Sequence, residues 1–193
     1  MKPAVFLDRD GTINEERSYI TRPEDIQLIP GADATIALLK DLGFAVVVVT
    51  NQAAIARGLL TENGLNEIHR HLEELLERSG AILDGIYHCP HHPEFPSSSS
   101  EPNCTCRKPK PGLILESARD LELDTKQSFM VGDSWSDLQA GWSAGCRVAL
   151  VLTGHGERTR ADAGGENLKR IDLIAESLTD VGEWICKNQP SGS

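Results

Sequence analysis

Short apolar runs and amphipathic segments alternate along this 193-residue chain. The apolar runs are too short for helices, which is typical of strands that are buried on both faces of a sheet. The segments between them place apolar residues three or four positions apart, which is typical of helices that cover a sheet. This pattern predicts strands at residues 4–7, 44–49, 82–87, 129–131 and 147–152, and helices at residues 32–42, 61–79, 113–121 and 137–144.

Strands that alternate with helices predict the α/β class and a doubly wound parallel sheet of the Rossmann type. A length of 193 residues fits one domain, which we place at residues 1–188 without a large cap domain. We expect a flexible tail at residues 189–193, and a loop at residues 93–102 because proline and serine dominate there. Ligands of such sheets bind beyond the carboxyl ends of the strands.

The charge and hydropathy of the chain exclude two classes of partner. A formal net charge of -10 argues against a nucleic-acid partner, because binding to a phosphate backbone needs a basic face. The longest uninterrupted apolar run, residues 44–49, is far too short to span a bilayer. Residues 1–3 lead directly into the first predicted strand and leave no room for a secretory signal. We therefore expect a cytoplasmic monomer with no nucleic-acid or membrane partner.

Polar residues with catalytic chemistry lie near the ends of the predicted strands. Asp8, Thr50 and Asp133 come at or just after strand ends, and Lys108 lies on a loop, so the fold should bring them to one edge. Asp8 and Asp10 are two residues apart, so one carboxylate can attack while the other moves protons. Oxygen ligands from Asp8 and Asp133 suit Mg²⁺, and Lys108 and Thr50 would hold the oxygens of a phosphate.

Three of the five cysteines, Cys89, Cys104 and Cys106, lie close together in a chain that we expect to remain reduced. With one histidine they supply the ligands of a closed, tetrahedral, structural Zn²⁺ site. Residue chemistry alone does not separate His91 from His92 as the fourth ligand. Zinc would crosslink the loop at residues 89–106, which has little hydrophobic core of its own.

Four segments resemble the motifs of the haloacid-dehalogenase superfamily in their order and spacing. They are Asp8-Arg9-Asp10-Gly11-Thr12, Thr50-Asn51-Gln52, Arg107-Lys108-Pro109 and Gly132-Asp133-Ser134. The resemblance implies that Asp8 forms an aspartyl-phosphate, and that Asp10 protonates the leaving oxygen and then activates water. It also implies a Mg²⁺ ion held by the carboxylates of Asp8 and Asp133 and by the backbone carbonyl of Asp10. Asp137, one helical turn after Asp133, is expected to support this site rather than to bind the metal.

The cysteine-rich loop is similar to that of the D-glycero-D-manno-heptose 1,7-bisphosphate 7-phosphatases and the related histidinol-phosphate phosphatases. This resemblance favours His91 as the fourth zinc ligand. The long gap between Cys89 and Cys104 is similar to the heptose branch, which implies removal of the 7-phosphate from a small sugar bisphosphate. By the same resemblance the substrate pocket would be lined by Glu16, Arg17, Ser18, Tyr19, Thr50, Asn51, Gln52, Ala53, Arg57, Arg107 and Lys108.

Two departures from that pattern keep other substrates open. Ala54 stands where the family often has glycine, and Ser134 stands where the heptose enzymes often have lysine. Histidinol phosphate is therefore the alternative substrate, and a noncatalytic zinc-loop interaction module is an alternative of another class. Arg107 could clamp the distal phosphate with two hydrogen bonds, whereas a surface ion pair is the plainer alternative for Arg57.

Overall fold

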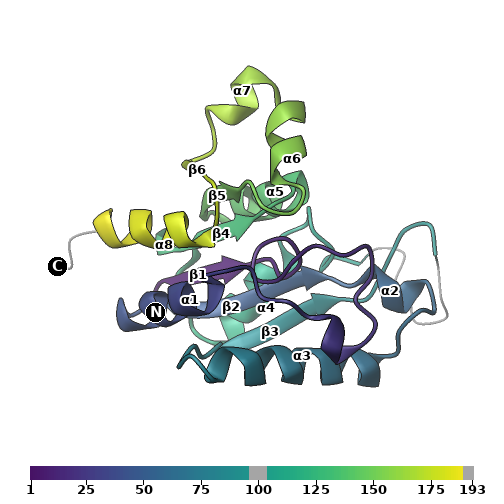
Figure 1. The fold of residues 1–193 in the computed structure, drawn as a ribbon. Coiled ribbons are helices and arrows are strands. Elements are labelled where there is room, and N and C mark those ends of the chain that lie inside the picture. Colours follow the sequence, from purple (N-terminus) through teal and green to yellow (C-terminus); the bar gives the residue numbers. More distant parts are fainter. Residues whose placement is uncertain (96–103, 189–193) are drawn as a thin grey trace.

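The protein folds around one parallel sheet. A computed structural model describes residues 1–95 and 104–188, and Figure 1 shows its arrangement. The sheet has six parallel strands in the order β3-β2-β1-β4-β5-β6. The strands are β1 (Ala4–Leu7), β2 (Ala45–Asn51), β3 (Gly85–Cys89), β4 (Phe129–Gly132), β5 (Arg147–Val151) and β6 (Leu173–Ala175).

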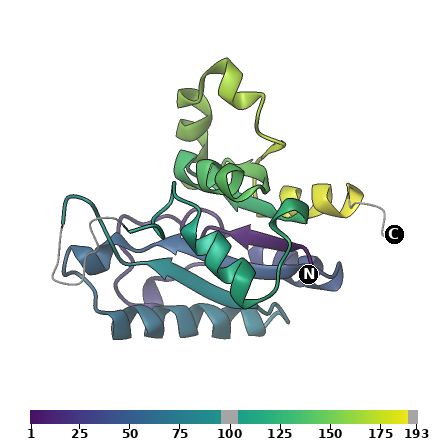
Figure 2. The same cartoon turned by 180° about the vertical axis from the view of Figure 1, so that it is seen from behind.

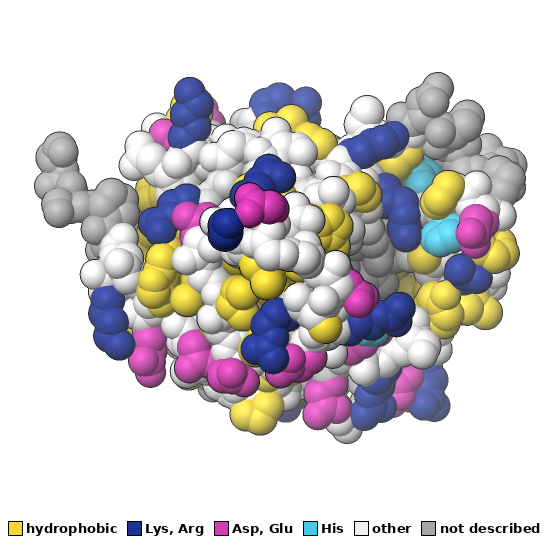
Figure 3. All heavy atoms as spheres, turned by 90° about the horizontal axis from the view of Figure 1, so that it is seen from above, with side chains coloured by type: hydrophobic (Ala, Val, Ile, Leu, Met, Phe, Trp, Pro, Cys, Tyr) yellow, Lys and Arg dark blue, Asp and Glu magenta, His cyan; other side chains and the backbone are white. Residues whose placement is uncertain are grey.

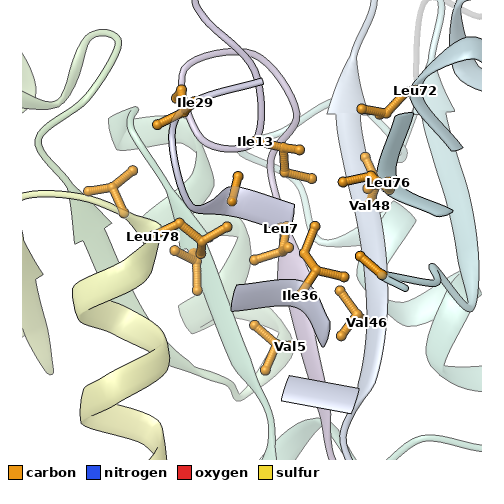
Figure 4. Close-up of a cluster of buried hydrophobic side chains, with 14 of the residues drawn as sticks. Val5, Leu7, Ile13, Ile29, Ile36, Val46, Val48, Leu72, Leu76 and Leu178 are labelled. Carbon is orange, nitrogen blue, oxygen red and sulfur yellow. The ribbon is translucent and has the colours of Figure 1, made fainter. Parts of the chain in front are cut away.

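Helices cover both faces of this sheet. Successive strand residues point to opposite sides, and since these residues are apolar, both sides have to be buried. Val5 and Leu7 of β1 join the core beneath α1, α3 and α8, and Figure 4 shows this core at close range. Ala4 and Phe6 join the core beneath α4 and α5, which lie on the other face. The helices of the two layers are α1 (Ala32–Asp41), α3 (Glu62–Glu77), α8 (Leu178–Lys187), α4 (Gly112–Asp120) and α5 (Trp135–Ala144).

The structure confirms the α/β class and the doubly wound parallel sheet. All five predicted strands and all four predicted helices are present. Thr61 caps α3 by accepting a hydrogen bond from the Gly64 amide at 3.1 Å. The third strand begins later than predicted, at Gly85, and Ile82 is 58% exposed. The reason is Asp84, whose carboxylate accepts bonds from Val46 N at 2.7 Å and Lys40 Nζ at 2.6 Å and so ends the turn before β3.

The C-terminal quarter holds elements that the hydrophobic pattern did not predict. Strand β6 has only three residues, and α6 (Gly156–Asp162) and α7 (Gly164–Leu168) are short helices that project beside β5 and β6 (Figures 1 and 2). The short helix α2 (Ala53–Ala56) also went unpredicted. Helix α8 did carry a signal, since Ser177 and Asp180 form a capping box at its start.

The described residues contain no large cap domain. None of the helices in residues 1–95 and 104–188 combines the length and hydrophobicity that a bilayer span requires. The predicted tail at residues 189–193 and most of the predicted loop at residues 93–102 lie outside the described residues.

Candidate active site

The carboxyl ends of the strands surround a pocket of about 300 Å³. Asp8 follows β1, Thr50 and Asn51 end β2, and Asp133 follows β4, so parallel strands deliver these side chains to one edge. Every predicted catalytic and substrate-binding residue lines this pocket except Arg57. The roles assigned to these residues from the sequence remain predictions, but the fold does bring the residues together.

Lys108 lies buried at the floor of the pocket beside Asp8. Its ammonium group is 2.7 Å from each of three oxygens, which are Asp8 Oδ1, Asp137 Oδ1 and the carbonyl of Val49. Burial opposes the charge, yet the two carboxylates raise the pKa of Lys108 above its ordinary value. Asn51 fixes the backbone of Lys108, because its side chain accepts from the Lys108 amide and donates to the Lys108 carbonyl, both at 3.0 Å.

Three carboxylates converge next to this lysine. Oxygens of Asp8, Asp133 and Asp137 all lie within 4.8 Å of one another. Burial and the neighbouring carboxylates raise the pKa of Asp8 to about 8 and the pKa of Asp133 to about 7. One ammonium group, that of Lys108, does not balance three carboxylates, and a hard divalent cation would neutralise the remaining negative charge.

The partners of Asp137 separate it from the other two acids. Its Oδ1 faces Lys108, while its Oδ2 accepts from the amide and the hydroxyl of Ser134 at 3.0 and 2.6 Å. Oδ1 is therefore in an ion pair, while Oδ2 is held by two hydrogen-bond donors. The supporting role of Asp137 stays a prediction, since its carboxylate also lies within 4.8 Å of those of Asp8 and Asp133, and its contact with Ser134 forms a capping box at the start of α5.

Two glycines let the backbone close around Asp133. A Cβ atom on Gly11 would lie 2.1 Å from Asp133 Oδ2, and one on Gly154 would lie 2.2 Å from the same oxygen. Both glycines also have positive φ angles, of 81° and 56°. The amide of His155 donates to that oxygen at 2.7 Å, so backbone groups hold the carboxylate in place.

Asp10 is held as an anion by a ring of donors. Arg9 donates to both of its oxygens at 2.7 to 3.1 Å, Asn14 donates to Oδ1 at 2.9 Å, and Gln52 donates to Oδ2 at 3.1 Å. Burial alone would raise the pKa of Asp10, but Arg9 and these hydrogen bonds hold it below the ordinary value. Gln52 also donates to Thr50 Oγ1 at 2.9 Å, which links the second motif to the first.

The predicted zinc ligands meet at one point beside the pocket. The ligand atoms of Cys89, His91, Cys104 and Cys106 all lie within 4.8 Å of one another. The sulfur atoms are 2.9 to 3.5 Å apart, which is too far for a disulfide. Three thiols and an imidazole fit a tetrahedral zinc site. His92 is turned elsewhere, since its Nδ1 accepts from the Glu94 amide at 3.2 Å.

The loop with these cysteines is joined to the pocket entrance by Arg107. Its backbone amide donates to Cys104 Sγ at 3.3 Å, and its guanidinium donates to the His91 carbonyl at 3.0 Å. Glu16 also lines the pocket, where burial and the charges of Asp10 and Asp8 raise the pKa of Glu16 to about 7. Viewed from above, the visible His side chains lie on one side of the molecule, whereas Lys and Arg side chains are spread over the whole of this face (Figure 3).

The sequence did not single out several residues that shape this pocket. Arg9 is only 1% exposed, which is unusual for arginine, and its pairing with Asp10 followed from no spacing rule. His155 and Ser136 also line the pocket. Glycine at position 154 was the available signal for the His155 turn, because a glycine after a strand often marks close backbone approach.

Comparisons with known proteins agree with this geometry. A family model described as HAD-hydrolase-like matches residues 105–181. The D-glycero-beta-D-manno-heptose-1,7-bisphosphate 7-phosphatase of Photorhabdus laumondii is 42% identical over 185 residues, which are 95% of this chain and 95% of that protein. The chain belongs to the haloacid-dehalogenase (HAD) superfamily.

Further relatives of this HAD phosphatase match it over nearly their whole length. The Escherichia coli K12 protein of the same name is 42% identical over 188 residues, covering 97% of this chain and 95% of the relative. A crystal structure of D,D-heptose 1,7-bisphosphate phosphatase from B. bronchiseptica, complexed with magnesium and phosphate, superposes with a TM-score of 0.85. It is 36% identical and covers 97% of this chain and 99% of that one.

Proposed function

We propose that this HAD phosphatase removes the 7-phosphate of D-glycero-D-manno-heptose 1,7-bisphosphate through an aspartyl-phosphate on Asp8. The observation that carries the proposal is the placement of Asp8 between Lys108 and Asp133 at the pocket floor. The chain is also 42% identical over 95% of its length to an enzyme with that name. The noncatalytic alternative loses its support, since these relatives are named as phosphatases.

The chemical steps follow from the positions of the side chains. Lys108 holds one oxygen of Asp8, and the carboxylate attacks phosphorus as the bond to the leaving ester oxygen breaks. Thr50 and Lys108 stabilise the charge on the phosphoryl oxygens. Asp10 gives a proton to the leaving oxygen, then takes one from the water that cleaves the phosphorus–oxygen bond to Asp8. Phosphate leaves with the proton that Asp10 took from the water, so the carboxylates of Asp8 and Asp10 are both regenerated.

The proton carried by Asp10 has to be acquired during the cycle. Arg9, Asn14 and Gln52 hold Asp10 as a carboxylate in the free enzyme, with its pKa below the ordinary value. A carboxylate suits the base that activates water, but it cannot act as an acid. Substrate binding must therefore bring a proton, which the monoanion of a phosphate ester can supply.

Two metal ions would have different tasks. The carboxylates of Asp8 and Asp133, with the backbone carbonyl of Asp10, would hold Mg²⁺, which neutralises phosphate charge so that a carboxylate can approach. Support comes from the raised pKa values of both acids and from the magnesium in the related crystal structure. Cys89, His91, Cys104 and Cys106 would hold a structural Zn²⁺ ion with no open position.

The remote part of the substrate would meet the entrance of the pocket. Among residues 1–95 and 104–188 the guanidinium of Arg107 bonds only to the His91 carbonyl, so its other donors can clamp the distal phosphate. The segments at residues 16–19 and 50–53 line the remaining walls. The relatives are named for a bisphosphate, and a second phosphate would reach beyond the nucleophile to this entrance.

A panel of phosphate esters tests the proposal. Purified enzyme with Mg²⁺ is given both anomers of the heptose 1,7-bisphosphate, histidinol phosphate and simple hexose phosphates, and phosphorus NMR identifies the phosphate that is released. We expect the highest kcat/KM with a heptose bisphosphate and loss of its 7-phosphate. A higher value with histidinol phosphate would select the alternative substrate.

The remaining sequence expectations stay proposals. We expect a monomer, to be tested by light scattering after size exclusion, with residues 1–188 unfolding as one domain. A cytoplasmic location is supported by the cluster of free thiols, which would oxidise outside a reducing compartment. Cell fractionation would test this location.

A further inference from the structure

Arg57 stands apart from the other predicted substrate-binding residues. It follows α2 and does not line the pocket. The carbon at the centre of its guanidinium lies 4.1 Å from the ring centroid of Phe95 and 5.7 Å from that of Tyr19. Both distances are in the range of attraction between a cation and an aromatic face.

These rings are the main partners that the structure gives to Arg57. Within residues 1–95 and 104–188 no carboxylate forms an ion pair with it, and its buried Nε atom has no hydrogen-bond partner. The surface ion pair considered from the sequence is thus absent from the described residues. Arginine suits this place better than lysine, because its planar guanidinium can stack on two faces.

The two rings come from different segments of the chain, and of the two only Tyr19 lines the pocket. Tyr19 lines the pocket and is 43% exposed, at the end of the loop that also carries Glu16. Phe95 lies between His91 and Cys104 in the sequence, and the centroid of its ring is 5.3 Å from that of His92, the residue after His91. Arg57 therefore connects the metal loop with the aromatic wall of the pocket.

We infer that Arg57 is a positioning residue, which holds Tyr19 against Phe95 and thereby shapes the pocket wall that meets the end of the substrate remote from the transferred phosphate. This inference rests on the proposed function only for the identity of the substrate. The phosphate site itself is built from Asp8, Thr50 and Lys108, which Arg57 does not contact. The stack should consequently affect substrate binding far more than the chemical step.

A double-mutant cycle distinguishes positioning from direct contact. The variants are Arg57→Leu, Phe95→Leu and both together, with Arg70→Leu on the exposed face of α3 as the matched control. We expect either single change to raise KM for the best ester by about five- to tenfold, as the loss of such contacts allows. The double variant should be no worse than either single one, because both changes break the same stack.

Other readouts separate the stack from a general loss of structure. The inhibition constant of inorganic phosphate and kcat should change less than about twofold in all variants, and Phe95→Tyr should restore KM because it keeps the ring. Additive effects of the two changes, or a normal KM in Phe95→Leu, would show that Arg57 touches the substrate directly and overturn the inference. If no heptose bisphosphate is hydrolysed, the proposed function fails. The double-mutant cycle can still test the role of Arg57, because it can be measured with any ester that the wild type hydrolyses.

Discussion

Asp8→Asn should abolish turnover and at the same time stabilise the metal-free protein. Asp8 lies among carboxylates in a buried site, and burial is the largest cause of its pKa of about 8. Between pH 3.8 and 8 the folded protein keeps a proton on Asp8 that the unfolded chain has released. Stability therefore falls as the pH rises through this window. A neutral asparagine removes that penalty, and its side-chain oxygen can still accept from Lys108.

The size of the effect follows from the pKa. At about 1.36 kcal/mol for each pH unit above the ordinary value of 3.8, Asp8 costs ~4 kcal/mol at pH 7 and ~2 kcal/mol at pH 5. For a chain of this length, 1 kcal/mol corresponds to a melting-temperature change of about 2 to 4 °C. The variant should thus melt on the order of 10 °C higher than the wild type at pH 7, and by less than half of that at pH 5.

Thermal unfolding in EDTA at several pH values measures this difference. Asp84→Asn is the matched control, because the contribution of Asp84 to stability should depend on pH in the opposite direction. Burial opposes the charge of Asp84, but bonds from Lys40 and the Val46 amide hold its pKa below the ordinary value, so its contribution is present at neutral pH and lost in acid. Equal melting temperatures for Asp8→Asn and wild type at pH 7 would refute the raised pKa of Asp8. A melting-temperature difference that does not change with pH would refute it as well. Turnover within about tenfold of wild type, only ~1.4 kcal/mol of barrier, would refute the covalent mechanism.

Three further predictions concern proton transfer and the two metals. Asp10→Asn should lower kcat by about 10²- to 10⁴-fold with a smaller change in KM, and an unchanged kcat would remove Asp10 from its acid and base role. Activity should vanish in EDTA and return with Mg²⁺ alone while zinc remains bound, so full activity in metal-free protein would contradict the cofactor assignment. Cys106→Ser should lower zinc below about one ion per chain and raise KM, because a hydroxyl is a weaker ligand than a thiolate. Elemental analysis and steady-state kinetics measure both effects, and unchanged values would count against a structural zinc.

The sheet was predictable from the sequence because its strands are buried on both faces. Val46 to Val49 form a continuous apolar run, which has few alternatives to a central strand. Strand β6 was not predicted for the opposite reason, since it has only three residues and Ile174 is 36% exposed. A strand at the edge of the sheet needs less apolar sequence, so its pattern is weak.

The candidate site was predictable where motifs fix both residue type and spacing. Asp8, Thr50, Lys108 and Asp133 are polar residues at the ends of apolar strands, and the parallel sheet forces them together. The pairing of Arg9 with Asp10 could not be predicted, because both residues lie beyond the end of β1, in a turn whose path no periodic pattern fixes. The contact of Arg57 with Phe95 joins distant segments through side-chain packing, which leaves no periodic signal in the sequence.

The connection between the metal loop and the pocket decides which kinetic constant zinc loss should affect. Cys106, Arg107 and Lys108 are consecutive, so the Cα atom of Lys108 lies at most about 7 Å from the Cα atom of the disturbed ligand. The anchors of the two basic residues differ, however. Arg107 is held by the loop itself, through Cys104 Sγ and the His91 carbonyl, whereas Lys108 is held by Asn51 of β2 and by buried oxygens of the sheet. Loss of zinc should therefore displace Arg107 and weaken binding of the distal phosphate, while Lys108 keeps its place and kcat changes little.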